Sequence, residues 1–193
     1  MAGEENRKLD TRKIAIISLM AAISVGLSYV EIPLTFFAPW LKLDFSNVPM
    51  LLTGFSMGLG EAFIVLAIKE LIWLARTDSF GVGQLANLLL GAVMLLPAVI
   101  CYQRSKTRKN ALIGMLIGVL LMAVAGVLTN KYMMLPFYAL LMGERIVAYL
   151  DAHPMILWTA VVPFNLLKGF SVSLITFILY KRLSPFIKKG LKG

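Results

Sequence analysis

Long apolar stretches, separated by short charged ones, limit this chain to very few folds. The clearest stretch, residues 111–134, is apolar almost throughout, and a helix that crosses the hydrocarbon core of a bilayer needs about 20 such residues. Over the whole chain 59% of residues are hydrophobic and 15% are charged, against about 45–50% and about 25% in a soluble domain. A water-soluble core cannot hide that much apolar surface. The chain is therefore predicted to be an all-α integral membrane protein.

The apolar stretches predict six transmembrane helices within a single membrane domain that covers residues 1–193. Their expected positions are about 14–30, 46–59, 61–76, 84–102, 111–134 and 155–180. The second stretch is short for a full crossing, and the glycines after it predict a helical hairpin over 46–76. If that hairpin enters and leaves on one side, the number of crossings falls to four. Residues 135–155 mix charged and apolar side chains, which predicts a short amphipathic helix at the membrane interface.

The positions of the lysines and arginines predict the orientation of the chain in the membrane. Basic residues before the first span, in the loop at 104–109 and after the last span outnumber those in the alternate loops. Because cytoplasmic flanks carry the excess of Lys and Arg, both termini are expected to be cytoplasmic. The net charge of +9 therefore indicates contact with a membrane surface and not with a nucleic acid.

Catalytic and nucleotide-binding motifs do not occur in the sequence. His153 is the only histidine and Cys101 the only cysteine, so neither a catalytic triad nor a cysteine or histidine metal site is expected. The phosphate-binding pattern GxxxxGK[ST] is also absent, so the chain is not expected to hydrolyse ATP itself. We therefore predict no enzyme activity, no catalytic residues, no metal and no catalytic cofactor.

Polar side chains inside or beside the apolar stretches are the candidates for a binding site. A polar side chain that faces lipid is costly and usually faces the bundle interior or a water-filled cavity. The predicted topology places six of them in the outer half to the middle of the bilayer: Asp44, Asn47, Asn87, Asn130, Asn165 and Lys168. Taken singly, an asparagine can simply join two helices, and Asp44 or Asn47 can cap one. Together they predict a binding site that faces outward.

Lys168 is the most informative of these residues. Asn165 and Lys168 are three positions apart and share one face of a helix, and Lys168 lies roughly 20 Å from the outer end of its span. A buried ammonium group without acceptors is penalised. Lys168 is therefore expected to pair with Asp44, with a ligand or with both. Lys69 beside Glu70 is interpreted as an ion pair or an interface anchor.

A face of small residues runs along the first predicted span. Ser18, Ala22 and Gly26 recur at every fourth position, and such a face lets the backbone of another helix approach closely. Gly114 and Gly118 repeat the same spacing. The spacing alone therefore leaves two interpretations open, packing within this chain and docking of another protein.

Three motifs resemble those of the riboflavin-binding S components of energy-coupling factor (ECF) transporters. The first is LKLDFSNVP at 41–49, followed by Gly54, Phe55 and Gly58. The second is NKY at 130–132 leading to LP at 135–136, and the third is PFNLLKG at 163–169. The motifs occur in the same order and with matching spacing, so the resemblance extends over nearly the whole chain.

The resemblance implies an S-component-like bundle of six helices that captures riboflavin from outside and delivers it inward. Riboflavin would be the transported ligand, and its pocket would be lined by Leu43, Asp44, Asn47, Asn87, Asn130, Asn165 and Lys168. Ser18, Ala22 and Gly26 would contact a shared ECF transmembrane coupling subunit that two ATPase subunits drive. The protein would lie among the lipids of a prokaryotic plasma membrane.

Two other functions stay open at this point. S components for thiamine, biotin or folate share the scaffold, although a cationic thiamine would fit poorly beside Lys168. A membrane enzyme or a self-sufficient secondary transporter is the other alternative. Uptake by vesicles that contain this chain alone would distinguish a secondary transporter from an S component.

Overall fold

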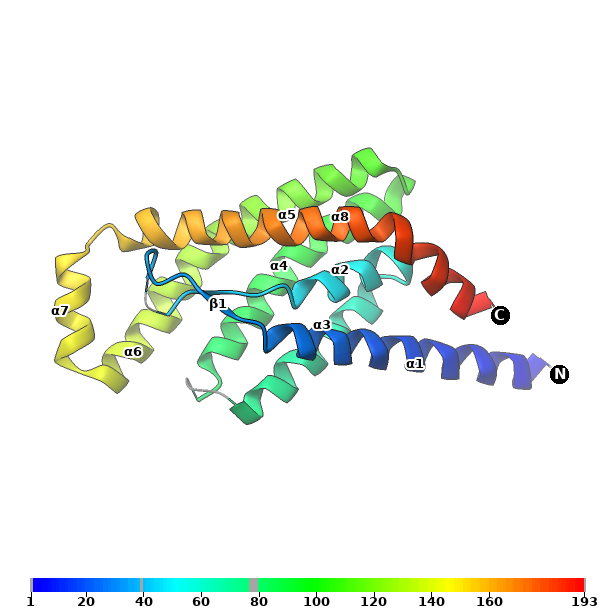
Figure 1. Cartoon of the computed structure of the whole chain (residues 1–193), viewed down its shortest axis with the longest axis horizontal. Helices are drawn as coiled ribbons and strands as arrows, with labels where there is room; N and C mark the ends of the chain where they lie inside the picture. Colours follow the sequence, from blue (N-terminus) through cyan, green and yellow to red (C-terminus); the bar gives the residue numbers. More distant parts are fainter. Residues whose placement is uncertain (1, 39, 77–79, 193) are drawn as a thin grey trace.

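Helices make up most of the chain in the computed structural model, which describes residues 2–38, 40–76 and 80–192 (Figure 1). The α-helices are α1 (Ala2–Ser28), α2 (Asn47–Ser56), α3 (Leu59–Trp73), α4 (Val82–Ser105), α5 (Arg108–Thr129), α6 (Leu135–Met142), α7 (Glu144–Ala152) and α8 (Val162–Lys192). A 3-10 turn (Leu74–Arg76) follows α3, and π-helical segments precede α6 (Asn130–Met134) and α8 (Leu157–Val161). The long helices pack into one bundle, with α6 and α7 at one end.

The short helix α2 lies inside the bundle. Every residue from Asn47 to Phe55 is buried, because this helix packs against α1, α3, α4 and α8. A helix of 10 residues is about 15 Å long, which is about half the thickness of the hydrocarbon core. The span predicted at 46–59 is therefore a shorter helix than expected, and an extended segment leads into it.

Four helical stretches within the described ranges are long and apolar enough to cross a membrane. They are Thr11–Ser28, Val82–Ser105, Arg108–Leu141 and Leu157–Leu183, and they correspond to the first, fourth, fifth and sixth predicted spans. The other two predicted spans fall in the hairpin of α2 and α3, and α3 has 15 residues. The chain is thus a multi-pass helical membrane protein, whereas the predicted count of six crossings stays unconfirmed.

A two-stranded antiparallel ribbon departs from the predicted all-α fold. β1 (Ile32–Pro33) pairs with β2 (Lys42–Leu43), and Ile32 lies opposite Leu43. Pro33 disfavours continuation of α1, and an ion pair of 2.8 Å between Lys42 and Glu31 joins the two sides of the ribbon. The all-α prediction therefore needs a small correction, since the connection between α1 and α2 folds back on itself as a ribbon.

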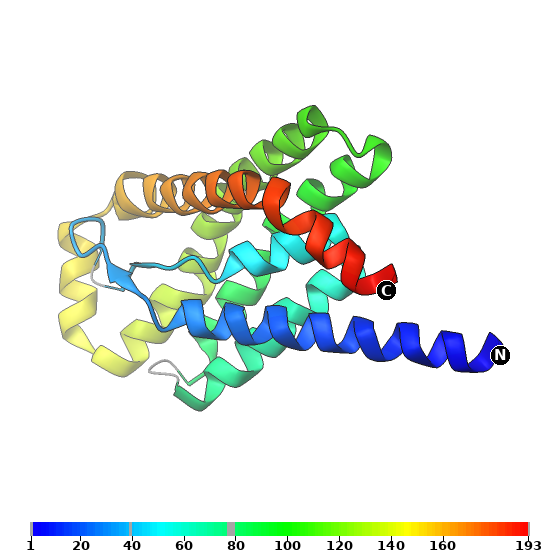
Figure 2. The ribbon, with the colours of Figure 1, turned by 45° about the vertical axis from the view of Figure 1, so that its right-hand side comes forward.

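The two ends of the bundle are formed by different segments of the chain. Both termini lie at one end, together with the turn between α4 and α5 (Figure 2). Toward that end the ring centroids of Phe55 and Tyr102 are 4.9 Å apart, and those of Tyr102 and Tyr180 are 5.5 Å apart. α6 and α7 lie at the opposite end, in the region where the sequence predicts an amphipathic helix. Aromatic packing thus fills the interior on the side of the termini.

Candidate functional site

A cavity of about 290 Å³ lies on the side of the bundle away from the termini. Its walls come from the end of α1, the segment before α2, the end of α3, the start of α4 and parts of α5, α6 and α8. Six of the seven residues predicted to bind ligand line it: Asp44, Asn47, Asn87, Asn130, Asn165 and Lys168. The fold therefore brings polar residues from distant parts of the sequence to one cavity.

Leu43 is the predicted ligand residue that does not line this cavity. It pairs with Ile32 in the ribbon, and its buried side chain belongs to a small apolar core with Leu41, Ile156 and Phe164. The side chain of Leu43 therefore contributes to packing of the ribbon against the start of the last long helix.

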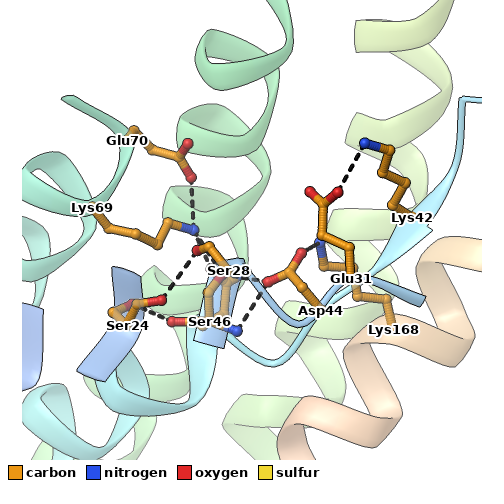
Figure 3. Close-up of polar contacts among 10 residues, drawn as sticks. Ser24, Ser28, Glu31, Lys42, Asp44, Ser46, Lys69, Glu70 and Lys168 are labelled. Carbon is orange, nitrogen blue, oxygen red and sulfur yellow. Dashed lines mark hydrogen bonds and ion pairs between the residues drawn. The ribbon is translucent and has the colours of Figure 1, made fainter. Parts of the chain in front are cut away.

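Lys168 reaches Asp44 across the interior of the bundle. The Lys168 ammonium donates to Asp44 Oδ2 at 2.6 Å, and only 6% of Lys168 is exposed. The pair forms because the extended segment before α2 carries Asp44 in among the helices, where it faces α8 (Figure 3). The predicted pairing of Lys168 with Asp44 is confirmed.

Asp44 uses both of its carboxylate oxygens within the protein. Oδ2 faces Lys168, and Oδ1 accepts hydrogen bonds from the backbone N–H of Ser46, at 2.9 Å, and from its hydroxyl. The Lys168 ammonium and these hydrogen bonds all stabilise the charged form of the Asp44 carboxylate. Asp44 is therefore an anion that keeps the Lys168 side chain oriented.

Lys69 and Glu70 extend this polar network behind the cavity. The Lys69 ammonium lies 2.7 Å from Glu70 Oε1 and donates to Ser46 Oγ at 3.1 Å and to Asn47 Oδ1 at 3.0 Å. Both charged side chains are buried, with 4% of Lys69 and 5% of Glu70 exposed. The predicted ion pair is confirmed, and both of its side chains are buried inside the bundle.

Asn165 keeps one buried acceptor unused. Its Nδ2 donates to the backbone carbonyl of Val161 at 2.9 Å, and its Oδ1 has no hydrogen-bond partner among the described residues. Gly126 on α5 makes room for this amide, since a Cβ at that position would collide with it. Buried acceptors are normally paired. The Oδ1 of Asn165 is therefore a buried acceptor that remains available to a hydrogen-bond donor.

The other two asparagines on long helices have different surroundings. Asn130, in the π-helical segment before α6, donates through Nδ2 to the Gly126 carbonyl at 2.9 Å and accepts from the Trp40 indole N–H at 3.2 Å. Asn87 is half-buried near the start of α4. Asn130 thus ties the loop that contains Trp40 to the wall of the cavity, while Asn87 contributes a polar side chain from the facing helix.

Aromatic side chains gather around the cavity. The ring of Trp40 lies 5.7 Å from that of Tyr138 and 6.1 Å from that of Tyr149, centroid to centroid. The Arg76 guanidinium lies 4.9 Å from the ring centroid of Tyr29. The sequence does not single out Arg76, Tyr29 or Tyr138 as site residues, because aromatic and basic residues near span ends are common interface anchors.

The small-residue face of α1 is not covered by the described part of the chain. Ser18, Ala22 and Gly26 are exposed, and a Cβ added at Gly26 would meet no described atom within 4 Å. In contrast, a Cβ at Gly114 would lie 2.7 Å from the Pro97 carbonyl oxygen. The same spacing therefore serves close packing between α4 and α5 and leaves an open face on α1.

The arrangement is suited to binding by hydrogen bonds. Among the described residues no group of three or more His, Cys, Asp or Glu side chains could hold a metal ion. The cavity instead combines amides, which can donate and accept at once, with two internally paired ammonium groups, those of Lys42 and Lys168, and several aromatic rings. The chemistry of these walls suits a flat or hydroxylated polar molecule.

Comparison with known proteins identifies relatives over most of the chain. Residues 12–180 match a model of the family described as "ECF transporter, substrate-specific component". The chain is 32% identical to the riboflavin transporter RibU of Staphylococcus aureus (strain TCH60), over 95% of this chain and 97% of that protein. It is 31% identical to the riboflavin transporter RibU of Streptococcus thermophilus (strain ATCC BAA-250 / LMG 18311), over 93% of this chain and 86% of that protein.

The fold is also similar to that of a solved structure described as "Structure and mechanism of the S component of a bacterial ECF transporter". The TM-score is 0.77 at 32% identity, and the match covers 93% of this chain and 99% of that chain. Sequence and fold thus point to one family, which is a family of transporter components and not of enzymes. This chain belongs to the family of ECF transporter substrate-specific components.

Proposed function

We propose that this chain captures riboflavin from outside the cell and delivers it inward with an ATP-driven ECF module. The observation that carries the proposal is the unpaired Oδ1 of Asn165 in the wall of a cavity that also holds the Lys168–Asp44 pair. Relatives over nearly the whole chain bear the name riboflavin transporter. The cavity would be the capture site.

The chemistry of riboflavin fits these walls. Its flat ring system requires an apolar slot with hydrogen bonds at the edge, and one ring N–H can donate to Asn165 Oδ1. The ribityl hydroxyls suit Asp44, Lys168 and the neighbouring amides, because each hydroxyl both donates and accepts. Trp40 would cover the ring from the loop side, held by its hydrogen bond to Asn130.

The first test is the colour and affinity of the purified protein. Protein extracted in mild detergent is expected to be yellow and to quench the fluorescence of added riboflavin. The Asn165→Ala variant should bind about tenfold more weakly, because the ring loses a buried acceptor. Asn110→Ala is the matched control, since the side-chain amide of Asn110 donates to the Cys101 carbonyl and to the Ser105 hydroxyl near the α4–α5 turn. Colourless wild-type protein that ignores riboflavin would refute the proposal.

Competition distinguishes riboflavin from other vitamins. Thiamine, biotin and folate are the alternatives for a shared scaffold, and the cation of thiamine would be repelled by Lys168. We expect none of the three to displace riboflavin at tenfold excess. Displacement by any one of them at equimolar concentration would reassign the ligand.

The proposal includes a topology for the whole chain. Residues 1–193 would form one membrane domain of six helical crossings in a prokaryotic plasma membrane, with the α2–α3 hairpin supplying two and both termini in the cytoplasm. Support comes from the basic residues of the α4–α5 turn, which share an end of the bundle with the termini: Arg104, Lys106, Arg108 and Lys109.

The open face of α1 would dock the rest of the transporter. A shared transmembrane coupling subunit would pack on Ser18, Ala22 and Gly26, and two ATPase subunits would drive it. The exposure of all three residues and the empty space beyond Gly26 support this assignment, because small exposed residues let a partner helix approach closely.

A larger side chain on this face of α1 should leave riboflavin binding intact and abolish transport. The Gly26→Leu variant is expected to bind riboflavin as the wild type does, because a Cβ at that position meets no described atom within 4 Å. It is also expected to lose ATP-driven uptake and co-purification with the coupling subunit. Val124→Phe, an enlargement on the exposed side of α5, is the control and should retain both. Unimpaired uptake by Gly26→Leu would remove α1 as the docking face.

A further inference from the structure

Lys69 and Glu70 occupy an unusual position relative to the cavity. Both are buried charges on α3, yet neither is among the described residues that line the 290 Å³ cavity. Burying a charge is costly unless it is paired and hydrogen-bonded. A buried charged pair that does not touch the cavity therefore needs another explanation, and its contacts supply one.

Among the described residues, three oxygens contact the Lys69 ammonium. One belongs to Glu70, at 2.7 Å, and the other two belong to the segment that leads into α2, with Ser46 Oγ at 3.1 Å and Asn47 Oδ1 at 3.0 Å. Because Lys69 holds the oxygen of the Asn47 amide, Asn47 has its NH2 group left to offer to a ligand in the cavity that it lines. Lys69 therefore determines that the Asn47 amide presents its NH2 group, and not its oxygen, to a ligand.

The contacts of Lys69 also help to fix the position of Asp44. Ser46 accepts a hydrogen bond from Lys69 and donates its own hydroxyl hydrogen to Asp44, while Lys168 approaches Asp44 from the opposite side. The four charges alternate in sign from α8 to α3, so the buried set is neutral (Figure 3). The segment from Asp44 to Asn47 is thus fixed between two lysines.

We propose that Lys69 is a positioning residue for the ligand, which orients Asn47 and Asp44 from outside the cavity while Glu70 neutralises its charge. The inference rests on the proposed function, since the ligand used to test it is riboflavin. Two of the three acceptors of Lys69 lie on the segment that carries ligand groups, and not on the neighbouring turns of α3. This set of partners supports a role for Lys69 in positioning that segment.

The test removes the pair without leaving a buried charge. Replacing both partners by apolar residues of similar size usually preserves stability, whereas removing one does not. The Lys69→Met/Glu70→Leu double variant is therefore expected to unfold in detergent at nearly the wild-type temperature. It should nevertheless bind riboflavin about 10- to 100-fold more weakly, because Asn47 and Ser46 lose a charged hydrogen-bond donor. Glu61→Gln, which removes a partly exposed ion pair with Lys13, is the control.

A double-mutant cycle with Asn47→Ala separates positioning from stability. If Lys69 acts through Asn47, the affinity lost on Asn47→Ala in the wild type should be largely absent in the Lys69→Met/Glu70→Leu background. Wild-type protein that does not bind riboflavin would refute the proposed function. Binding by the wild type together with double-variant affinity within twofold of it would overturn this inference alone. Fully additive losses accompanied by a lower melting temperature would also overturn it.

Discussion

Replacing Lys168 by methionine is expected to abolish measurable riboflavin binding and to destabilise the protein. The substitution keeps the length and apolar part of the side chain but leaves the Asp44 carboxylate without its partner at 2.6 Å. Breaking a buried ion pair by removing one partner costs about 3–5 kcal/mol, and such a loss corresponds to a factor of 100 or more in an equilibrium constant. Fluorescence titration with riboflavin and thermal unfolding in detergent measure the two effects.

The same substitution at Lys181 is the matched control. Lys181 lies on the same helix, α8, but is exposed, so Lys181→Met should change neither affinity nor unfolding temperature. The Asp44→Asn/Lys168→Met variant tests the cause, because it removes both charges. It should recover most of the lost stability and still fail to bind. Normal riboflavin affinity in Lys168→Met would exclude Lys168 from the site.

Adding a single methyl group at Gly126 should weaken riboflavin binding about 10- to 100-fold. A Cβ there would collide with the Nδ2 of Asn165 and lie 2.9 Å from its Cγ, so the Asn165 amide has to move. Overpacking a filled interior typically costs about 1–3 kcal/mol. The Gly126→Ala change also disturbs Asn130, which donates to the carbonyl of Gly126. Riboflavin affinity and the absorption spectrum of the bound flavin check this result.

Gly60→Ala is the control for the added methyl group. Gly60 lies on α3, where a Cβ meets nothing within 4 Å, so this change should leave binding unaltered. A Gly126→Ala variant that binds as tightly as the wild type would show that the position of Asn165 tolerates movement. The assignment of its Oδ1 to the ligand would then fail.

Much of the candidate site could be predicted because a polar side chain inside a membrane costs free energy and is therefore rare. Asn165 and Lys168 stand out in an apolar stretch, and their spacing of three places them on one helix face. Both line the cavity, and the expected partner of Lys168 is the observed one, Asp44. Only the family resemblance points to Leu43, and its side chain belongs to the small apolar core beside the ribbon.

Other site features could not be found in this way. Lys69 and Glu70 lie near the end of a predicted span, where charged residues are ordinarily interface anchors. The neighbouring sequence therefore does not indicate that α2 and the segment before it cover them. Trp40 reaches Asn130 over a separation of 90 positions, and Gly126 is needed only because Asn165 lies against it. These contacts depend on how helices pack, which helix periodicity does not specify.

The sequence by itself determined the membrane class, the approximate position of the long helices and, through its motifs, the family. These follow from hydrophobicity and charge, which act over one or two turns of helix or over the length of a span. Only the tertiary structure decided that α2 lies buried inside the bundle, that a ribbon joins it to α1, and that Lys69 donates to Ser46 and Asn47. The reason is physical. A buried charge pairs with the group that the packed helices hold at the same depth and facing it, and both depth and direction depend on the whole bundle.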